Sequence, residues 1–152
     1  MTLGPITAAS PVDDRERSWA DTLKAHNRRV TKQRMAVMRA TAASSHASAE
    51  QIHKYASEAL PQLALSTTHM ILHDLTNVRL LRRVEVPNSP TLYEVETGDN
   101  HHHVQCVKCG RLEDVECAVG HAPCLEPSHA HGIDIDVAEV LYRGLCEDCK
   151  EA

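Results

Sequence analysis

Two pairs of cysteines carry the clearest chemical signal in the chain. Cys106 and Cys109 form one Cys-x-x-Cys pair, Cys146 and Cys149 form a second, and 36 residues lie between the pairs. Two intervening residues let both sulfurs of a pair turn toward one point, so the pairs can supply four thiolates to a tetrahedral Zn²⁺ ion. Two disulfides or a redox dithiol are the alternatives. The spacing favours a closed, structural zinc site.

Three consecutive histidines stand just before the first cysteine pair. On a strand, His101 and His103 would point to the same face and could bind one ion together. Asp114, Glu94 and His46 could add carboxylate and imidazole ligands. A mixed set of this kind suits Fe²⁺, Mn²⁺, Zn²⁺ or Ni²⁺. The residues predict a second, open metal site, and surface histidines without a ligand role are the alternative.

A looser group of histidines and cysteines follows between the two pairs. Its side chains could bind another metal or act as redox thiols, although we favour a polar loop without either role. The group comprises Cys117, His121, Cys124, His129 and His131.

Composition and charge limit the class of protein. The chain has 152 residues, enough for one domain or two small ones, and without Phe its core must be aliphatic. It has no apolar run of about 18 residues and no signal peptide at its start, so we expect a cytoplasmic protein that does not contact the membrane. Residues 15–83 carry 12 Lys and Arg against 5 Asp and Glu, whereas residues 84–152 carry 4 against 14. This asymmetry suggests a basic half that meets a polyanion, and accidental clustering of surface charge is the alternative.

The order of predicted elements indicates an α+β protein that begins with a winged helix. After a flexible arm over residues 1–12, the apolar pattern predicts four helices and then a hairpin, which together span residues 13–97. Thr31 can cap the second helix, Ser48 with Gln51 can form a capping box on the third, and Ser66 or Thr67 can cap the fourth. Residues 98–152 form a smaller domain, with strands predicted over 104–107, 112–115 and 136–145.

The predicted DNA contacts lie in the basic half. The stretch 15–39 suits phosphate contacts, and the fourth helix is the candidate recognition helix. We expect contacts from Arg28, Arg29, Lys32, Arg34, Ser66, Thr67, Thr68 and His69.

These features resemble the ferric uptake regulator family over nearly the whole chain, from Asp13 to Cys149. The likeness rests on RVTKQR at 29–34, SHASAE at 45–50, HHHVQCVKCGRLED at 101–114 and CEDC at 146–149. It implies an N-terminal winged helix, a C-terminal α/β dimerisation domain, and a homodimeric, metal-dependent repressor that binds a palindromic operator in double-stranded DNA.

The resemblance also assigns the metal sites. It makes Cys106, Cys109, Cys146 and Cys149 the structural Zn²⁺ site. It assigns the regulatory site for Fe²⁺ or Mn²⁺, at the interdomain hinge, to His46, Glu94, His101, His103 and Asp114. Glu96 is the substitute if Glu94 is not a ligand.

Aspartate at position 114 resembles the peroxide-sensing branch of the family. The segments at 122–127 and 138–146 are similar to actinobacterial regulators of catalase genes. This likeness implies that H₂O₂ oxidises a ligand histidine, His46 or His101, when iron is bound. The recognition helix departs from the family pattern, since Ala64 replaces Ser, His69 replaces Tyr and Arg79 replaces Gly.

Three other functions remain open at this point. A regulator of iron, zinc or nickel uptake would share the same fold and ligands. A zinc hydrolase could use a water on the open His and carboxylate site, although it would not need the basic stretch. A divergent relative could bind metal without binding DNA.

Overall fold

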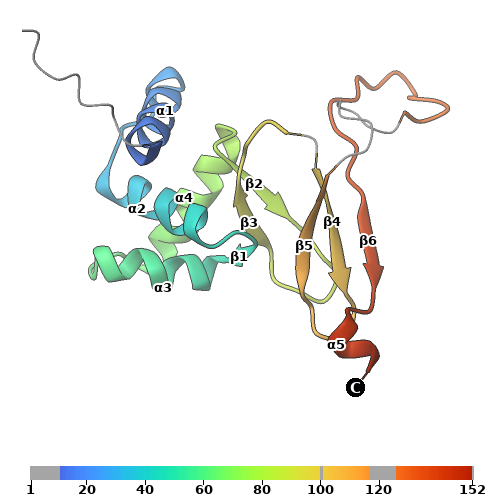
Figure 1. The fold of residues 1–152 in the computed structure, drawn as a ribbon. Helices are drawn as coiled ribbons and strands as arrows, with labels where there is room; N and C mark the ends of the chain where they lie inside the picture. Colours follow the sequence, from blue (N-terminus) through green and yellow to red (C-terminus); the bar gives the residue numbers. More distant parts are fainter. Residues whose placement is uncertain (1–10, 100, 117–125, 152) are drawn as a thin grey trace, which may run out of the picture. The chain divides into compact units, whose positions relative to one another are not determined.

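The computed structural model describes residues 11–99, 101–116 and 126–151 (Figure 1). The chain divides into two compact units: Met1–Glu85 with Pro90–Glu96, and Val86–Ser89 with Thr97–Ala152. The short segment Val86–Ser89, at the turn of a hairpin, belongs with the second unit by its contacts.

Four helices and a small sheet build the first unit. The helices are α1 (Pro11–Ala25), α2 (Lys32–Ala43), α3 (Ala49–Ala59) and α4 (Leu65–Asn77). Strands β1 (Ala47–Ser48), β2 (Leu81–Val84) and β3 (Leu92–Val95) form an antiparallel sheet in the order β1-β3-β2 (Figure 1). This is the predicted winged helix, with the addition of the two-residue strand β1.

Local capping residues fix where the helices begin. Thr31 accepts a hydrogen bond from the backbone N–H of Arg34, and Ser48 and Gln51 form a complete capping box on α3, as predicted. The predicted cap of α4 was wrong, because the helix begins earlier. Ala64 is its N-cap, and its side chain accepts no hydrogen bond there.

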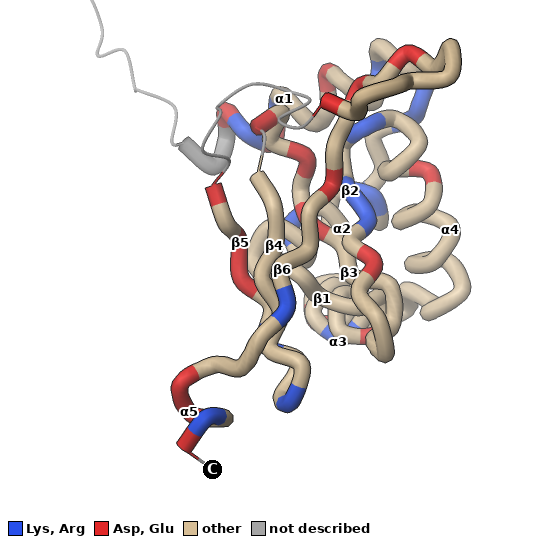
Figure 2. Tube along the Cα trace, turned by 90° about the vertical axis from the view of Figure 1, so that its right-hand side faces the viewer, with Lys and Arg blue, Asp and Glu red and all other residues tan. Residues whose placement is uncertain are grey.

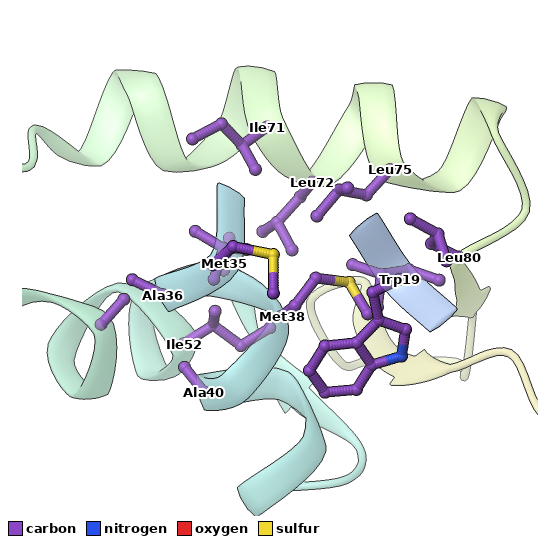
Figure 3. Close-up of a cluster of buried hydrophobic side chains, with 14 of the residues drawn as sticks. Trp19, Met35, Ala36, Met38, Ala40, Ile52, Ile71, Leu72, Leu75 and Leu80 are labelled. Atoms are coloured by element: carbon purple, nitrogen blue, oxygen red, sulfur yellow. The ribbon is translucent and has the colours of Figure 1, made fainter. Parts of the chain in front are cut away.

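The core of the first unit is aliphatic, as the composition requires. Ile71, Leu72 and Leu75 of α4 point toward Met35 and Met38 of α2 (Figure 3). Burying these side chains removes apolar surface from water, which stabilises the fold by about 25 cal/mol for each Å² buried. The single tryptophan, on α1, is also buried and covers the same cluster (Figure 3). Helix α4 is therefore held to the unit by its apolar face.

A three-stranded sheet and one short helix form the second unit. Strand β4 (His101–Cys106) lies in the middle, antiparallel to β5 (Leu112–Glu116) and parallel to β6 (Leu141–Gly144). Helix α5 (Glu147–Lys150) follows β6. Strand β5 carries Glu113, Asp114 and Glu116, drawn red in Figure 2.

Strand β4 begins three residues earlier than the sequence predicted, so the histidine run lies on the strand itself. Strand β6 is shorter than predicted. No helix in the described part of the chain has the length and apolar character that crossing a lipid bilayer requires.

Candidate metal centres

The four cysteines of the two Cys-x-x-Cys pairs converge in the second unit. All four are free thiols, and their sulfurs lie within 4.8 Å of one another. Cys109 Sγ and Cys146 Sγ are 3.8 Å apart. A tetrahedron with Zn–S bonds of about 2.3 Å has edges of about 3.8 Å between its sulfurs. The cluster therefore fits a zinc site, and the disulfide alternative is not observed at these four residues.

Two turns aim the sulfurs. The backbone N–H of Gly110 donates to the carbonyl of Cys106, and that of Cys149 donates to the carbonyl of Cys146. Gly110 has a φ of +79°, a left-handed conformation that glycine adopts without steric cost, so the chain can turn tightly after the first pair. The second pair lies at the start of α5.

Two of the four cysteines have pKa values shifted in opposite directions. Backbone N–H groups of Cys109 and Cys146 donate to the sulfur of Cys106 and lower its pKa to about 5. The hydrogen bond with Cys146, together with burial and the nearby charge of Cys106, raises the pKa of Cys149 to about 12. Four thiolates at this spacing repel one another, so a divalent cation is needed to hold all of them ionised.

A second group of ligand types lies at the start of β4. His101 Nε2 and His103 Nε2 lie 3.7 Å and 3.5 Å from the same oxygen of Asp114 on β5. Asp114 is directly opposite His103 in the strand pairing. His102, between the two histidines, is buried and is on the opposite face of the sheet, because successive strand residues alternate between faces. The predicted convergence of His101, His103 and Asp114 is thus present within the second unit.

Asp99 was not among the predicted site residues. Its Oδ1 lies 2.8 Å from His101 Nδ1 and also accepts a hydrogen bond from Thr97 Oγ1 at 2.6 Å. A carboxylate on Nδ1 fixes the imidazole orientation and directs Nε2 as the ligand atom. The sequence offered one signal, an acid two residues before the histidine run.

The first unit contains the other two predicted ligands side by side. His46 Nε2 lies 3.0 Å from Glu94 Oε2, and Arg82 Nε lies 2.6 Å from Glu94 Oε1. Glu94 is buried, with 5% of its side chain exposed. His46 has a φ of +58°, which costs a non-glycine residue about 1 kcal/mol or more. Backbone strain of this kind clusters at functional sites.

Each of the two groups joins imidazole and carboxylate groups, which can hold a divalent transition metal. The nitrogen and oxygen donors of these residues therefore suit a regulatory divalent metal ion. Arg82 was not predicted, because its pairing with Glu94 is set by strand register and not by spacing along the chain.

The predicted DNA contacts fall into three kinds. Arg29, Lys32, Ser66 and His69 are exposed, and Thr67 is half-buried. Thr68 is fully buried, and its hydroxyl lies 3.0 Å from His53 Nδ1. The prediction of a DNA contact from Thr68 was therefore wrong, because Thr68 lies on the buried face of α4 and exposes no surface to DNA.

The remaining two predicted contacts, Arg28 and Arg34, bind a carboxylate of the protein itself. Arg28 Nε lies 2.7 Å from Asp74 Oδ1, and Arg34 Nη2 lies 2.8 Å from Asp74 Oδ2. Burial by itself would raise the pKa of Asp74, but the two guanidinium groups together outweigh it and lower that pKa.

The loose histidine and cysteine group lies mostly outside the described residues. Cys117, His121 and Cys124 fall there. His129 and His131 are described, and their rings meet edge to face with centroids 4.3 Å apart. No role for this group follows from that contact.

A winged helix with a four-cysteine cluster that fits zinc, together with the match to a family of regulators, identifies a metal-dependent transcriptional regulator, not an enzyme. The model of the ferric uptake regulator family matches residues 25–141, and the chain belongs to this family. Regulators of this family bind DNA and are dimeric.

Named relatives and a solved structure agree with this assignment. Transcriptional regulator FurA of Mycobacterium tuberculosis is 44% identical over 131 residues, which are 86% of this chain and 89% of that protein. The peroxide-responsive repressor PerR of Staphylococcus epidermidis is 29% identical over 129 residues, 81% of this chain and 82% of that protein. The structure of the Helicobacter pylori ferric uptake regulator Fur shares the fold with a TM-score of 0.71 at 17% identity, covering 94% of this chain and 96% of that one.

Proposed function

We propose that this chain is a cytoplasmic homodimeric repressor that binds a palindromic operator only when a regulatory metal ion is bound. The observation that carries the proposal is the pair of ligand groups: His46 with Glu94 in the first unit, and His101, His103 and Asp114 in the second. A metal ion bound at these ligands would favour one conformation of the protein over others. A ligand shifts such an equilibrium by its differential affinity for the two arrangements.

The four cysteines would hold a structural Zn²⁺ that stabilises the second unit. Its sheet has only three short strands, so burial alone gives it little stability. Self-association would remove exposed apolar side chains of the same unit from water. They are Val104, Val107, Ile133, Val137, Tyr142 and Leu145.

DNA contacts would come from the exposed residues of the first unit. Arg29 and Lys32 suit phosphate contacts, which position a protein on the duplex without reading sequence. His69, with Ser66 and Thr67, lies in the first half of α4 and could reach base edges. Because His69 stands where relatives usually carry Tyr, the operator read by this chain would differ at that base.

The regulatory ion would be Fe²⁺ or Mn²⁺, and the iron form would sense peroxide. Bound iron supplies the chemistry that activates H₂O₂. One oxygen atom of H₂O₂ is inserted into the ring of a ligand histidine, His46 or His101, and the other leaves as water. The oxidised imidazole is a poorer ligand, so metal and DNA are released. Asp114, exposed over 55% of its side chain, leaves this group open to a small molecule.

Operator binding before and after peroxide tests this proposal. Iron-loaded protein should release DNA at low H₂O₂ and gain one oxygen atom on His46 or His101, measured by mass spectrometry. Manganese-loaded protein should resist. The Cys117→Ser, Cys124→Ser double variant is the control for a thiol route. If that variant alone became insensitive, the sensor would be a thiol pair. If neither metal form responded, the chain would be a regulator of metal uptake.

A further inference from the structure

We propose that Asp74 is a positioning residue that holds Arg28 and Arg34 away from the DNA backbone and so limits nonspecific DNA binding. The inference rests on the proposed DNA-binding function. It changes the role of two arginines that the sequence assigned to phosphate contact, and it gives a role to an acid on the recognition helix.

Asp74 joins three elements of the first unit. It lies in the second half of α4, Arg34 lies in the first turn of α2, and Arg28 lies between α1 and α2. Each carboxylate oxygen receives a different guanidinium, at 2.7 Å from Arg28 Nε and 2.8 Å from Arg34 Nη2. One carboxylate therefore neutralises one of the two positive charges and fixes both side chains.

Both guanidinium groups have a second internal acceptor. Arg34 Nη1 donates to the carbonyl of Arg29 at 2.9 Å, and Arg28 Nη1 donates to the carbonyl of His26 at 3.3 Å. Only 22% of the Arg34 side chain is exposed. A phosphate would have to replace these partners, so the contact would exchange one anion for another with little gain.

The cost of that exchange falls on Asp74. Its side chain is 21% exposed, and removing its arginine partners would leave a part-buried carboxylate without compensation near the negative DNA backbone. Arg29 and Lys32, by contrast, are exposed within the same stretch. Arg29 and Lys32 are therefore the residues of the stretch 28–34 that remain available for phosphate contacts. The ion pairs of Asp74 also hold α4 against this stretch.

This arrangement favours sequence reading over general affinity. Phosphate contacts supply nonspecific binding, and each adds about 0.9 to the slope of log affinity against log salt concentration. Two fewer contacts in each protomer weaken binding to random DNA. The base contacts proposed for α4 are unaffected, so they supply a larger share of the total binding free energy.

Binding of a random-sequence duplex, measured by fluorescence anisotropy across a salt series, tests the inference. Asp74→Asn removes the carboxylate charge and should steepen the salt slope by about 1–2 per protomer, which adds roughly a tenfold loss of affinity between 50 mM and 200 mM salt. Glu58→Gln, which removes an exposed acid on α3, is the charge-matched control and should leave the slope unchanged. Arg28→Gln and Arg34→Gln together should remove the extra slope in the Asp74→Asn background.

The single variants Arg28→Gln and Arg34→Gln give an independent answer if Asp74→Asn does not fold. In the otherwise native protein each should leave the salt slope unchanged, since neither arginine contacts phosphate. A decrease of about 1 in the salt slope of either variant would overturn this inference without affecting the proposed DNA-binding function. Absence of DNA binding by both the native protein and Asp74→Asn at low salt would contradict the proposed function, and the inference with it.

Discussion

Arg82 and Glu94 face each other across strands β2 and β3, with Arg82 Nε 2.6 Å from Glu94 Oε1. The other carboxylate oxygen lies 3.0 Å from His46 Nε2. Register therefore orients a buried carboxylate so that one oxygen meets a permanent cation and the other meets the proposed ligand histidine. At the proposed regulatory site, Arg82 would both orient Glu94 toward the metal ion and repel that ion.

Replacing Arg82 should strengthen regulatory metal binding. Arg82→Gln removes a cation beside a buried carboxylate, so we expect the affinity for Mn²⁺ to rise by about tenfold, measured by titration of zinc-loaded protein. Arg83→Gln, which removes the same charge from an exposed neighbour on the strand, is the matched control. A fall in Mn²⁺ affinity would mean that Arg82 acts chiefly by orienting Glu94.

Zinc binding at neutral pH should release a proton from Cys149. Its pKa in the metal-free protein is raised to about 12, so the thiol is neutral at pH 7, whereas the zinc ligand is the thiolate. Proton release on adding Zn²⁺ to reduced, metal-free protein in weak buffer measures the total from the four thiols, to which Cys149 should contribute one proton. Zinc uptake with no proton release would show that Cys149 is not a thiolate ligand.

The opposite shift at Cys106 contributes to the stability of the folded, metal-free protein. Its folded pKa is lowered to about 5, so the stabilisation is present above the unfolded pKa of about 8.5 and is lost as pH falls through about 5. Protons also compete with zinc for the thiolates, so removal of zinc by a chelator should accelerate as pH falls, with loss of the dimer. Cys106→Ser and Cys149→Ser should be monomeric or aggregated at any pH. A stable, zinc-free dimer of either variant would exclude a structural role for the cluster.

Arg79→Gly should stabilise the first unit. Arg79 follows α4 with a φ of +58°, and the backbone N–H groups of Arg79 and Leu80 donate back to Thr76 and Leu75 in a helix-ending turn that favours glycine. We expect a gain of about 1 kcal/mol in the free energy of unfolding. Arg79→Ala keeps the steric cost and should give no such gain. Equal stability of the Gly and Ala variants would show that the left-handed backbone at this position carries no steric cost.

Local patterns in the sequence predicted most helices and strands and the four-cysteine cluster, but not the ion pairs between distant residues. The Cys-x-x-Cys pairs and the Ser48 capping box depend on residues a few positions apart, so spacing alone identified them. The pairs Arg28–Asp74 and Arg82–Glu94 join residues 46 and 12 positions apart, and only tertiary packing or strand register brings them together. Thr68 was misassigned because the helical period did not establish which face of α4 is buried.

In the proposed mechanism, the His and carboxylate groups couple metal binding to DNA binding. The most direct measurement is the affinity of zinc-loaded protein for its operator, selected from a random DNA pool, with and without Mn²⁺. Native protein should gain at least about tenfold in affinity with Mn²⁺. His103→Ala and Asp114→Ala should lose that gain while keeping zinc and the folded state, and His129→Ala, an exposed histidine outside both ligand groups, should keep it. Full activation by Mn²⁺ in the folded His103→Ala and Asp114→Ala variants would contradict the account.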